Sequence, residues 1–452
     1  MRTGFAILAC AALTTVLADP ATGQQWHIEP VETTGSTGEY TSITIDSQDH
    51  PHIAYYNNTE GGLKYAWNDG SSWHLQLVDA GDNIGWWTSI AVDSSDHPHI
   101  SYFDYWGDGL RYASWNGSVW SIEEIIAGDY GYDYTSIALD SGDGPHISCR
   151  FYVSYGTTHL KYAWHDGSSW HVDTVDDAGA VGAWSSIEVN SDDLPCIAYN
   201  DETNSALKYA SFDGSSWLIE TVDSEGSTGQ WCSLELDSLD RPHISYYNGT
   251  DYRLMYAWWD GDSWQRDTVN SSGYMGSFSE LALDSGDLPH ISFWDLSNND
   301  LMYAHFDGNQ WTTETVHSQY DVGMWTSIDV DSEDSPHISY EYNYYGDLYY
   351  AWYEQPQGIE GASGAGLPGL SLLPPAPNPC VHSASVGFTL EVQASVVLSL
   401  FDTTGRLVER TELGSYSAGK HEVTVSSMSA GIYLYRLEAG SSTEEGRLVV
   451  IR

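Results

Sequence analysis

The feature that most constrains the fold is a short phrase that recurs seven times. It first reads Pro51-His52-Ile53-Ala54-Tyr55, and a second phrase, Leu63-Lys64-Tyr65-Ala66, follows twelve residues after the proline, or fifteen in the third repeat. The prolines recur at steps of 47 residues, except for one step of 50, and stand at Pro51, Pro98, Pro145, Pro195, Pro242, Pro289 and Pro336. Such a period indicates one supersecondary unit copied along the chain, which buries its core against its neighbours. The three extra residues of the third repeat are expected in a loop.

Each unit is predicted to contain four short antiparallel strands. In the second unit, the sequence favours strands at 88–93, 99–102 and 110–115 and a fourth that begins at Trp120, because these segments alternate and are rich in β-branched and aromatic residues. The proline begins the second strand, where a missing N–H is tolerated. Asn116-Gly117 suits a tight hairpin turn before the fourth strand. Four strands in 40 to 50 residues are typical of a β-propeller blade.

The ends of the repeat array predict how the ring closes. The tryptophan of the fourth strand appears at positions 26, 73, 120, 170, 217, 264 and 311, so the first one precedes the first complete unit, and the last unit has none. Residues 26–31 should therefore supply the missing strand to the seventh blade and remove two exposed sheet edges. We expect an all-β chain with a seven-bladed β-propeller over residues 24–354. An all-β solenoid is the alternative, but it would not need this N-terminal strand.

These repeats resemble bacterial secreted β-propellers built from short repeats, including those with Asp-box turns. The resemblance covers the chain from Trp26 to Trp352 and concerns architecture. The turn at 68–73 has one residue fewer between Asp69 and Trp73 than an Asp box has. The resemblance therefore implies the fold, and it transfers no activity.

The N-terminal residues predict export. Arg2 precedes an apolar stretch from Phe5 to Leu17 that ends in small residues, which is typical of a secretory signal peptide over residues 1–18. Cys10 inside the stretch leaves a lipoprotein signal as the alternative. No later segment has the roughly 20 apolar residues of a transmembrane helix. Residues 355–373 are rich in Gly, Pro, Ser and Ala, which predicts a flexible linker.

A separate domain is expected at 374–452. Its ordered elements are Pro377-Asn378-Pro379, Val397–Asp402, Gly405–Val408, Gly419, Ala430–Tyr433 and Leu448–Val450. This order and spacing resemble a type IX secretion sorting domain. The resemblance implies a small immunoglobulin-like β-sandwich of about seven strands, recognition by the type IX machinery, and later removal with attachment to the surface or release. A β-sandwich that only packs on the propeller is the alternative.

Charge excludes some partners. The chain has 64 acidic and 15 basic residues, a net charge of −49, which excludes a surface that tracks nucleic-acid phosphates and disfavours anionic membranes. The same position of the third strand carries a cation in the first four blades. This predicts either a basic patch for an anionic glycan or local pairing with Asp. These residues are Lys64, Arg111, Lys161 and Lys208.

Metal binding is left open by the sequence. Six aspartates end the first strand of a blade, with a second Asp three residues later and a His nearby: Asp46, Asp93, Asp140, Asp237, Asp284 and Asp331. Such groups could ligate a metal, with Ca²⁺ as the candidate, or they could cap turns and bond across strands. Cys149, Cys196, Cys232 and Cys380 match no zinc site or disulfide framework, so free thiols are expected.

Ligand binding is expected on the face where the loops between blades and the loops between second and third strands lie, because these loops are long and aromatic. An aromatic residue stands directly before the first strand of every blade and should ring the mouth of the central channel: Tyr40, Trp87, Tyr134, Trp184, Trp231, Phe278 and Trp325. Further aromatic residues that differ between blades are expected in the loops between second and third strands: Tyr105, Trp106, Tyr152, Tyr155, Tyr252, Trp294, Tyr344 and Tyr345. Aromatic faces stack on sugar C–H faces. For the ring, packing between blades is the alternative.

The sequence favours a binding module that recognises carbohydrate or another extracellular ligand. No catalytic residue is assigned, since no nucleophile elbow, phosphate loop or HExxH motif occurs. A sialidase needs three convergent arginines, and most of the five in the propeller fall on repeat positions. They are Arg111, Arg150, Arg241, Arg253 and Arg266. A glycan-active enzyme, either a glycosidase or a lyase, and a structural or assembly protein of the surface are the alternatives.

Overall fold

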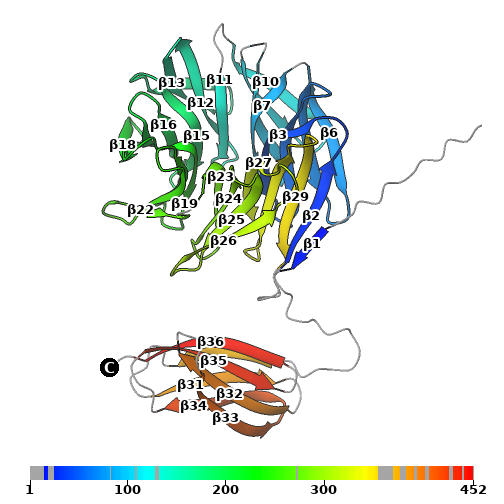
Figure 1. Ribbon diagram of the computed structural model, residues 1–452, viewed down its shortest axis with the longest axis vertical. Coiled ribbons are helices and arrows are strands. Elements are labelled where there is room, and N and C mark those ends of the chain that lie inside the picture. The colour runs from blue at the N-terminus through cyan, green and yellow to red at the C-terminus, as the bar shows by residue number, and fades with distance from the viewer. Residues whose placement is uncertain are drawn as a thin grey trace, which may run out of the picture. The chain divides into compact units, whose positions relative to one another are not determined.

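The computed structural model describes residues 15–18, 25–81, 83–105, 107, 109–127, 132–270, 273–354, 370–376, 383–390, 394–402, 407–426, 431–439 and 442–450. The chain forms two compact units, Met1–Pro356 and Gln357–Arg452 (Figure 1). The described residues form strands, turns and bends, and they contain no helix long and apolar enough to span a membrane.

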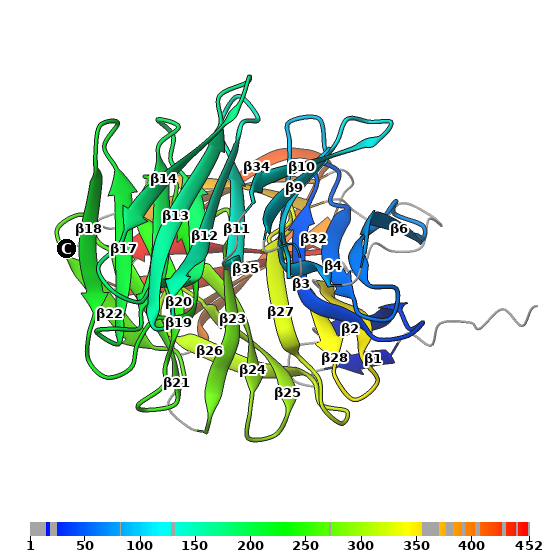
Figure 2. The same ribbon diagram turned by 90° about the horizontal axis from the view of Figure 1, so that it is seen from above.

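Seven antiparallel sheets, the blades, form the first unit (Figures 1 and 2). Blades 1 and 2 consist of β3 (Thr37–Ile45), β4 (Pro51–Asn57), β5 (Gly62–Asn68), β6 (Trp73–Ala80), β7 (Ile84–Val92), β8 (Pro98–Asp104), β9 (Gly109–Trp115) and β10 (Trp120–Ile126). Blades 3 and 4 consist of β11 (Tyr132–Leu139), β12 (Pro145–Ser154), β13 (Thr157–His165), β14 (Trp170–Asp176), β15 (Val181–Val189), β16 (Pro195–Asp201), β17 (Ala206–Phe212) and β18 (Trp217–Asp223). Blades 5 and 6 consist of β19 (Gln230–Leu236), β20 (Pro242–Asn248), β21 (Arg253–Trp259), β22 (Trp264–Thr268), β23 (Met275–Leu283), β24 (Pro289–Asp295), β25 (Asp300–Phe306) and β26 (Trp311–His317). Blade 7 contains β27 (Met324–Val330), β28 (Pro336–Tyr342) and β29 (Asp347–Glu354).

The first strand of each blade contacts the first strand of the next, and β27 contacts β3. The seven blades therefore form a closed ring around a central channel, as predicted. We call the four strands of a blade a to d, from the channel outward.

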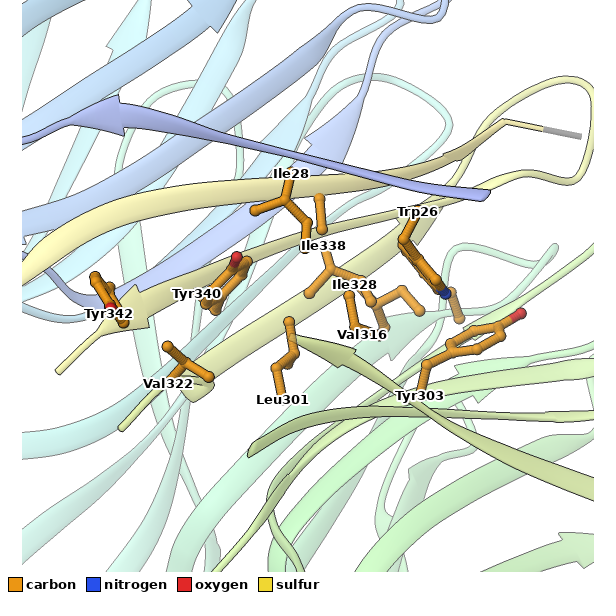
Figure 3. Close-up of a cluster of buried hydrophobic side chains, with 12 residues drawn as sticks. Trp26, Ile28, Leu301, Tyr303, Val316, Val322, Ile328, Ile338, Tyr340 and Tyr342 are labelled. Atoms are coloured by element: carbon orange, nitrogen blue, oxygen red, sulfur yellow. The ribbon is translucent and has the colours of Figure 1, made fainter. Parts of the chain in front are cut away.

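The N-terminal strand closes the ring. β2 (Gln25–Glu32) pairs antiparallel with β29 and supplies strand d of blade 7. Trp26 is 4% exposed and packs edge-on against Tyr303 of blade 6 (Figure 3), with ring centroids 5.2 Å apart. It packs in the same way against Tyr353 of blade 7, at 5.1 Å. Its indole N–H donates to Glu314 at 2.9 Å. The predicted closure is confirmed, and a single tryptophan joins blades 6 and 7.

A further strand lies on the outer edge of blade 7. β1 (Thr15–Ala18) pairs antiparallel with β2. These four residues belong to the predicted signal peptide, whose residues 1–14 lie outside the described residues, and the signal peptide stays a prediction. Cleavage after Ala18 would remove β1 and leave blade 7 with four strands, like the other six blades.

A second ring of contacts links the turns between strands a and b. In blade 1, the Ser47 amide and hydroxyl donate to Asp96 of blade 2 at 3.0 and 2.8 Å. The same pair of bonds occurs at every boundary and ends with Ser332 of blade 7 on Asp49 of blade 1. The second Asp of each Asp-x-x-Asp pair thus binds the neighbouring blade.

The first Asp of each pair stabilises its own blade. Asp46 accepts the backbone N–H groups of Gln48 and His50 at 2.8 Å, and His52 lies 3.2 Å from it. The other ring nitrogen of His52 lies 2.6 Å from the Tyr65 hydroxyl. Although burial raises the pKa of Asp46, these hydrogen bonds hold it below its ordinary value. Turn capping and a strand-to-strand bond, the alternative to metal binding, account for this repeated group.

Two local predictions need correction. Strand a of blade 2 begins at Ile84, four residues before the predicted start, because Trp87 sits in a bulge within the strand and does not precede it. In blade 3, the three extra residues are not in an irregular loop. They lengthen the β12–β13 hairpin, whose ladder continues to Ser154 and Thr157, and place Tyr155 fully exposed at its tip.

Glycine allows strand a to approach the preceding blade closely. Gly229, two residues before the channel aromatic Trp231, has φ of +88°, and a Cβ there would lie 2.8 Å from the Leu207 Cα. We expect Gly229→Ala to lower the free energy of unfolding by about 2–3 kcal/mol, through a backbone clash added to an unfavourable φ. Gly261→Ala is the control, since its φ is +101° but nothing lies within 4 Å. Urea denaturation measures both, and equal losses would contradict the role of the clash.

The second unit is a small β-sandwich, as predicted. One sheet has the order β30-β31-β34 and the other β33-β32-β35-β36. The strands are β30 (Leu370–Ala376), β31 (Ser383–Leu390), β32 (Ala394–Asp402), β33 (Leu407–Tyr416), β34 (Gly419–Ser426), β35 (Gly431–Ala439) and β36 (Ser442–Val450). Phe388 of the first sheet shares a buried core with Leu398 and Tyr435 of the second.

Candidate binding face of the propeller

The seven predicted channel aromatics all adopt a left-handed backbone conformation, with φ between 47° and 55°. In blade 2, the register shifts between Trp86 and Ser89, and Trp87 occupies the bulge; corresponding shifts occur in the other blades. Left-handed φ costs a bulky residue roughly 1–2 kcal/mol. The bulge directs the side chain into the channel, where contacts offset that cost.

These residues form a closed aromatic ring. Ring centroids of successive members are 4.2 to 5.4 Å apart around the full circle from Tyr40 back to Tyr40. The ring lines a cavity of about 140 Å³. A cavity of that size holds a molecule about as large as benzene, and every ring already contacts two neighbours. The geometry brings the predicted residues together, and their part in ligand binding stays a prediction.

Below the aromatic ring, strand a presents small hydroxyl groups and acids to the channel. The Ser42 hydroxyl accepts the N–H of Ile90 in the next blade at 3.2 Å, and five other boundaries repeat this bond. Four carboxyl groups also lie here: Glu188, Glu235, Glu280 and Asp329. Burial raises the pKa of Glu188 to about 8 and of Glu280 to about 7. Burial also raises the pKa values of Glu235 and Asp329, and the neighbouring acids raise that of Glu235 further.

No metal centre is evident in the parts of the chain that the structure describes. There, no group of three or more His, Cys, Asp or Glu side chains is placed to hold a metal ion. Cys149, Cys196 and Cys232 are buried free thiols, as expected, and Cys380 lies outside the described residues.

Exposed tyrosines distinguish the loop face. Tyr320, Tyr344 and Tyr345, from the loops around β27 and β28, are 66, 62 and 57% exposed and contact one another, with centroids 5.2 and 4.8 Å apart. Tyr252 and Tyr274 form a second exposed pair at 4.5 Å. We call these five residues the loop tyrosines. Unlike the aromatic ring, they leave ring faces open to solvent.

The predicted loop aromatics have different outcomes. Tyr105 is exposed and stacks on Trp86 at 4.7 Å. Trp106 lies outside the described residues. Trp294 is not in a loop, because it lies on β24, is 9% exposed and packs against Phe278 of the aromatic ring at 6.0 Å. Trp294 directly follows the strand phrase of blade 6, as the buried Tyr56 and Phe103 follow the phrases of blades 1 and 2. This shared position is the signal that could have identified it as buried.

The cations of strand c pair locally. Lys64 contacts Glu32 at 2.5 Å, Arg111 contacts Asp79 and Asp104 at 3.0 and 2.6 Å, and Lys208 contacts Asp176 and Asp201 at 3.1 and 3.0 Å. Lys161 donates to Thr174 at 2.6 Å. The acid comes from strand d of the preceding blade in three cases. Pairing with acids therefore accounts for Lys64, Arg111 and Lys208, whereas Lys161 bonds within its own blade.

Sequence reasoning missed one groove on the rim between blades 4 and 5. It contains Arg253, Arg266 and Trp264, and Tyr252 stands beside it in the chain. Arg253 occupies a column in which the other blades have Gly62, Gly109, His159, Ala206, Asp300 and Asp347. That departure from the repeat is the signal that could have found it.

Comparison with known proteins identifies one part of the chain. Residues 376–451 match the family described as Secretion system C-terminal sorting domain. The C-terminal unit is a type IX secretion sorting domain. A sorting domain of this kind marks the chain for secretion to the cell surface. No curated protein matches the sequence.

Solved structures resemble the propeller fold over about two thirds of this chain. An ulvan lyase of a new polysaccharide lyase family, bound to GlcA(1-4)Rha3S, is 12% identical with a TM-score of 0.53, over 71% of this chain and 94% of that one. The SapL1 lectin in complex with alpha methyl fucoside is 13% identical with a TM-score of 0.45, over 64% and 98%. An Aleuria aurantia lectin variant in complex with Fucalpha1-6GlcNAc is 12% identical with a TM-score of 0.47, over 64% and 99%. At these identities the likeness concerns the fold alone.

Proposed function

We propose that the protein is an exported binding protein whose propeller recognises a saccharide on its loop face. The loop tyrosines carry this proposal, because they are exposed, contact one another in pairs, and differ from blade to blade. A side chain needed for folding recurs in every blade, whereas a specific site needs residues that do not recur.

The chemistry of the face suits a sugar. Tyrosine presents an apolar ring to sugar C–H groups and a hydroxyl to sugar oxygens. Asn343, whose side-chain N–H donates to Asp321 at 3.2 Å, places polar groups beside Tyr344 and Tyr320. Export to the surface through the sorting domain brings this face to extracellular polysaccharides. The ulvan lyase has a similar fold, and its structure contains a bound saccharide. The fold is therefore compatible with such a ligand.

The test is a binding screen of the full chain against neutral and acidic polysaccharides. We expect Tyr320→Ala combined with Tyr344→Ala to weaken the Kd of any bound saccharide by about tenfold, because a stacking contact of about 1–1.5 kcal/mol is lost. Tyr155→Ala is the matched control, since Tyr155 is an exposed tyrosine on the same face with no ring contact among the described residues.

Two further variants separate the loop tyrosines from the aromatic ring. Trp87→Ala and Trp184→Ala should weaken binding only if the ligand enters the channel mouth. Loss of binding in these variants, with none in the tyrosine variant, would move the site to the ring. No binding to any polysaccharide would contradict the proposed function and favour a scaffold or protein-binding role.

A further inference from the structure

A polar groove of about 470 Å³ lies at the boundary of blades 4 and 5. Asp223 and Glu225 form the blade 4 side, and β21 with β22 forms the blade 5 side. β22 is five residues long, whereas β10, β14, β18 and β26 are seven. The paired residues of β21 and β22 therefore end at Met255 and Thr268, and one further backbone bond runs from the Val269 N–H to the Leu254 carbonyl at 3.0 Å, directly after Arg253.

The two arginines of the groove differ in their partners. Arg266 contacts Asp223 and lies 3.0 Å from Glu225, so it is neutralised by blade 4. Arg253 is half-buried, and its guanidinium makes no hydrogen bond or ion pair with any residue that the structure describes. By contrast, Lys64, Lys208, Arg111, Arg150 and Arg241 each contact at least one carboxylate. In a chain of net charge −49, a guanidinium without a carboxylate is an exception.

The groove offers a complementary set of groups to one ligand class. The Arg253 guanidinium presents a planar fork of N–H donors that suits a carboxylate or sulfate oxyanion. Asp251 is exposed, and among the described residues its carboxylate has no partner, so it can accept from sugar hydroxyls. The indole of Trp264, anchored by its N–H to Glu220 at 3.0 Å, gives the groove an apolar wall. Tyr252 of the loop tyrosines follows Asp251 directly.

The negative charge of the whole chain does not exclude an anionic ligand. At 0.15 M salt, charges further than about 8 Å away are largely screened. Within the groove, Asp223 and Glu225 are already paired with Arg266, which leaves Arg253 against Asp251 alone. The charged groups inside the groove therefore determine whether an anion binds Arg253, and the net charge of the chain does not.

We propose that this groove binds an acidic group of the saccharide, a carboxylate or a sulfate, through the Arg253 guanidinium, which rests on the saccharide-binding function proposed above. The test is titration calorimetry of the full chain at 0.15 M salt with polygalacturonate, dextran sulfate, carboxymethyl-dextran and neutral dextran. We expect Arg253→Ala to weaken binding of an acidic probe by about tenfold or more, and Arg253→Lys to recover part of it. Arg241→Ala is the matched control, since it removes the same charge from an arginine paired with Asp237.

The outcomes separate this inference from the proposed function. Loss of acidic binding in Arg253→Ala with no loss in Arg241→Ala supports the groove, and the carboxylated or sulfated probe that binds identifies the oxyanion. Acidic binding that Arg253→Ala leaves unchanged overturns the inference. If only the neutral probe binds, and its binding depends on the loop tyrosines, the inference about the groove is overturned but the proposed function is supported. No binding to any probe overturns both.

Discussion

Replacing Trp26 with alanine should lower the free energy of unfolding by about 3–5 kcal/mol and release the N-terminal strand. Trp26 is almost fully buried, and its ring packs against Tyr303 (Figure 3) and Tyr353. Removal of a buried tryptophan leaves a cavity whose cost is of this size. The loss should also open the ring, because β2 pairs with β29 without a hairpin turn to join them and depends on such packing to stay in place.

Trp170→Ala is the matched control for this prediction. Trp170 begins strand d of blade 3, packs edge-on against Tyr112 at 5.1 Å, and donates to Glu123 at 3.0 Å. Its strand is joined to its own blade by a short turn, so the variant should lose stability without opening the ring. Hydrogen exchange measures the difference. Amides of β2 should exchange faster in Trp26→Ala but not in Trp170→Ala, and equal exchange of β2 in both would contradict the closing role of Trp26.

Replacing two channel acids, Glu188→Gln with Glu235→Gln, should stabilise the propeller at pH 8 by about 2 kcal/mol or more and leave it unchanged at pH 4. Burial and the neighbouring acids, Asp329 among them, raise the pKa of both groups in the folded protein, to about 8 for Glu188. Below about pH 4.5 both the folded and the unfolded chain hold these protons. As the pH rises from about 4.5 to 8, the unfolded chain loses them first, so stability falls across this window. Glutamine keeps the size of the side chain and removes the titration.

Calorimetric melting at pH 4, 6 and 8 checks this prediction. The control variant, Glu124→Gln with Glu333→Gln, removes two exposed carboxylates and changes the net charge by the same amount. A gain in Tm at pH 8 in both variants would attribute the effect to general repulsion in an acidic chain. A gain only in the channel variant would attribute it to burial.

The blades and their closure could be predicted because the same strand pattern occurs seven times in the sequence. The proline phrase gave strand b, and the position of Trp26 before the first complete unit gave the closing strand. The sorting domain followed from its ordered elements, which match at residues 376–451. Repetition averages out the local ambiguity that a single strand of six or seven residues would have.

The bulges could not be predicted from local preference. A tryptophan such as Trp87 disfavours positive φ, so the sequence placed it before strand a and not inside it. The conformation is selected by contacts with residues of other blades, Tyr40, Tyr134 and Trp325. Trp294 was misplaced for a related reason, since an aromatic residue at a strand end is compatible with both a loop and a packed position.

The candidate site was predicted at the level of the face but not of its residues. Tyr252, Tyr344 and Tyr345 stood out as blade-specific aromatics. By contrast, Tyr274 and Tyr320 lie in the loops that join one blade to the next, so their neighbours in space are set by two blades together. Arg253 looks like an ordinary strand residue until its partners are examined. Whether the Arg253 guanidinium has an acidic partner depends on residues of a neighbouring blade, so the sequence of its own repeat could not show it.

Ring closure by β2 also sets an order of events during synthesis. Trp26 and Glu314 are 288 residues apart in sequence, and such distant pairing is slow to form. β2 is synthesised before every complete blade and cannot pair with β29 until that strand has been made. β29 ends at Glu354, just before the sorting domain in the chain. A chain that contains its sorting domain therefore also contains every strand the ring needs, whereas a chain cut before β29 would lack both the sorting domain and the partner of β2.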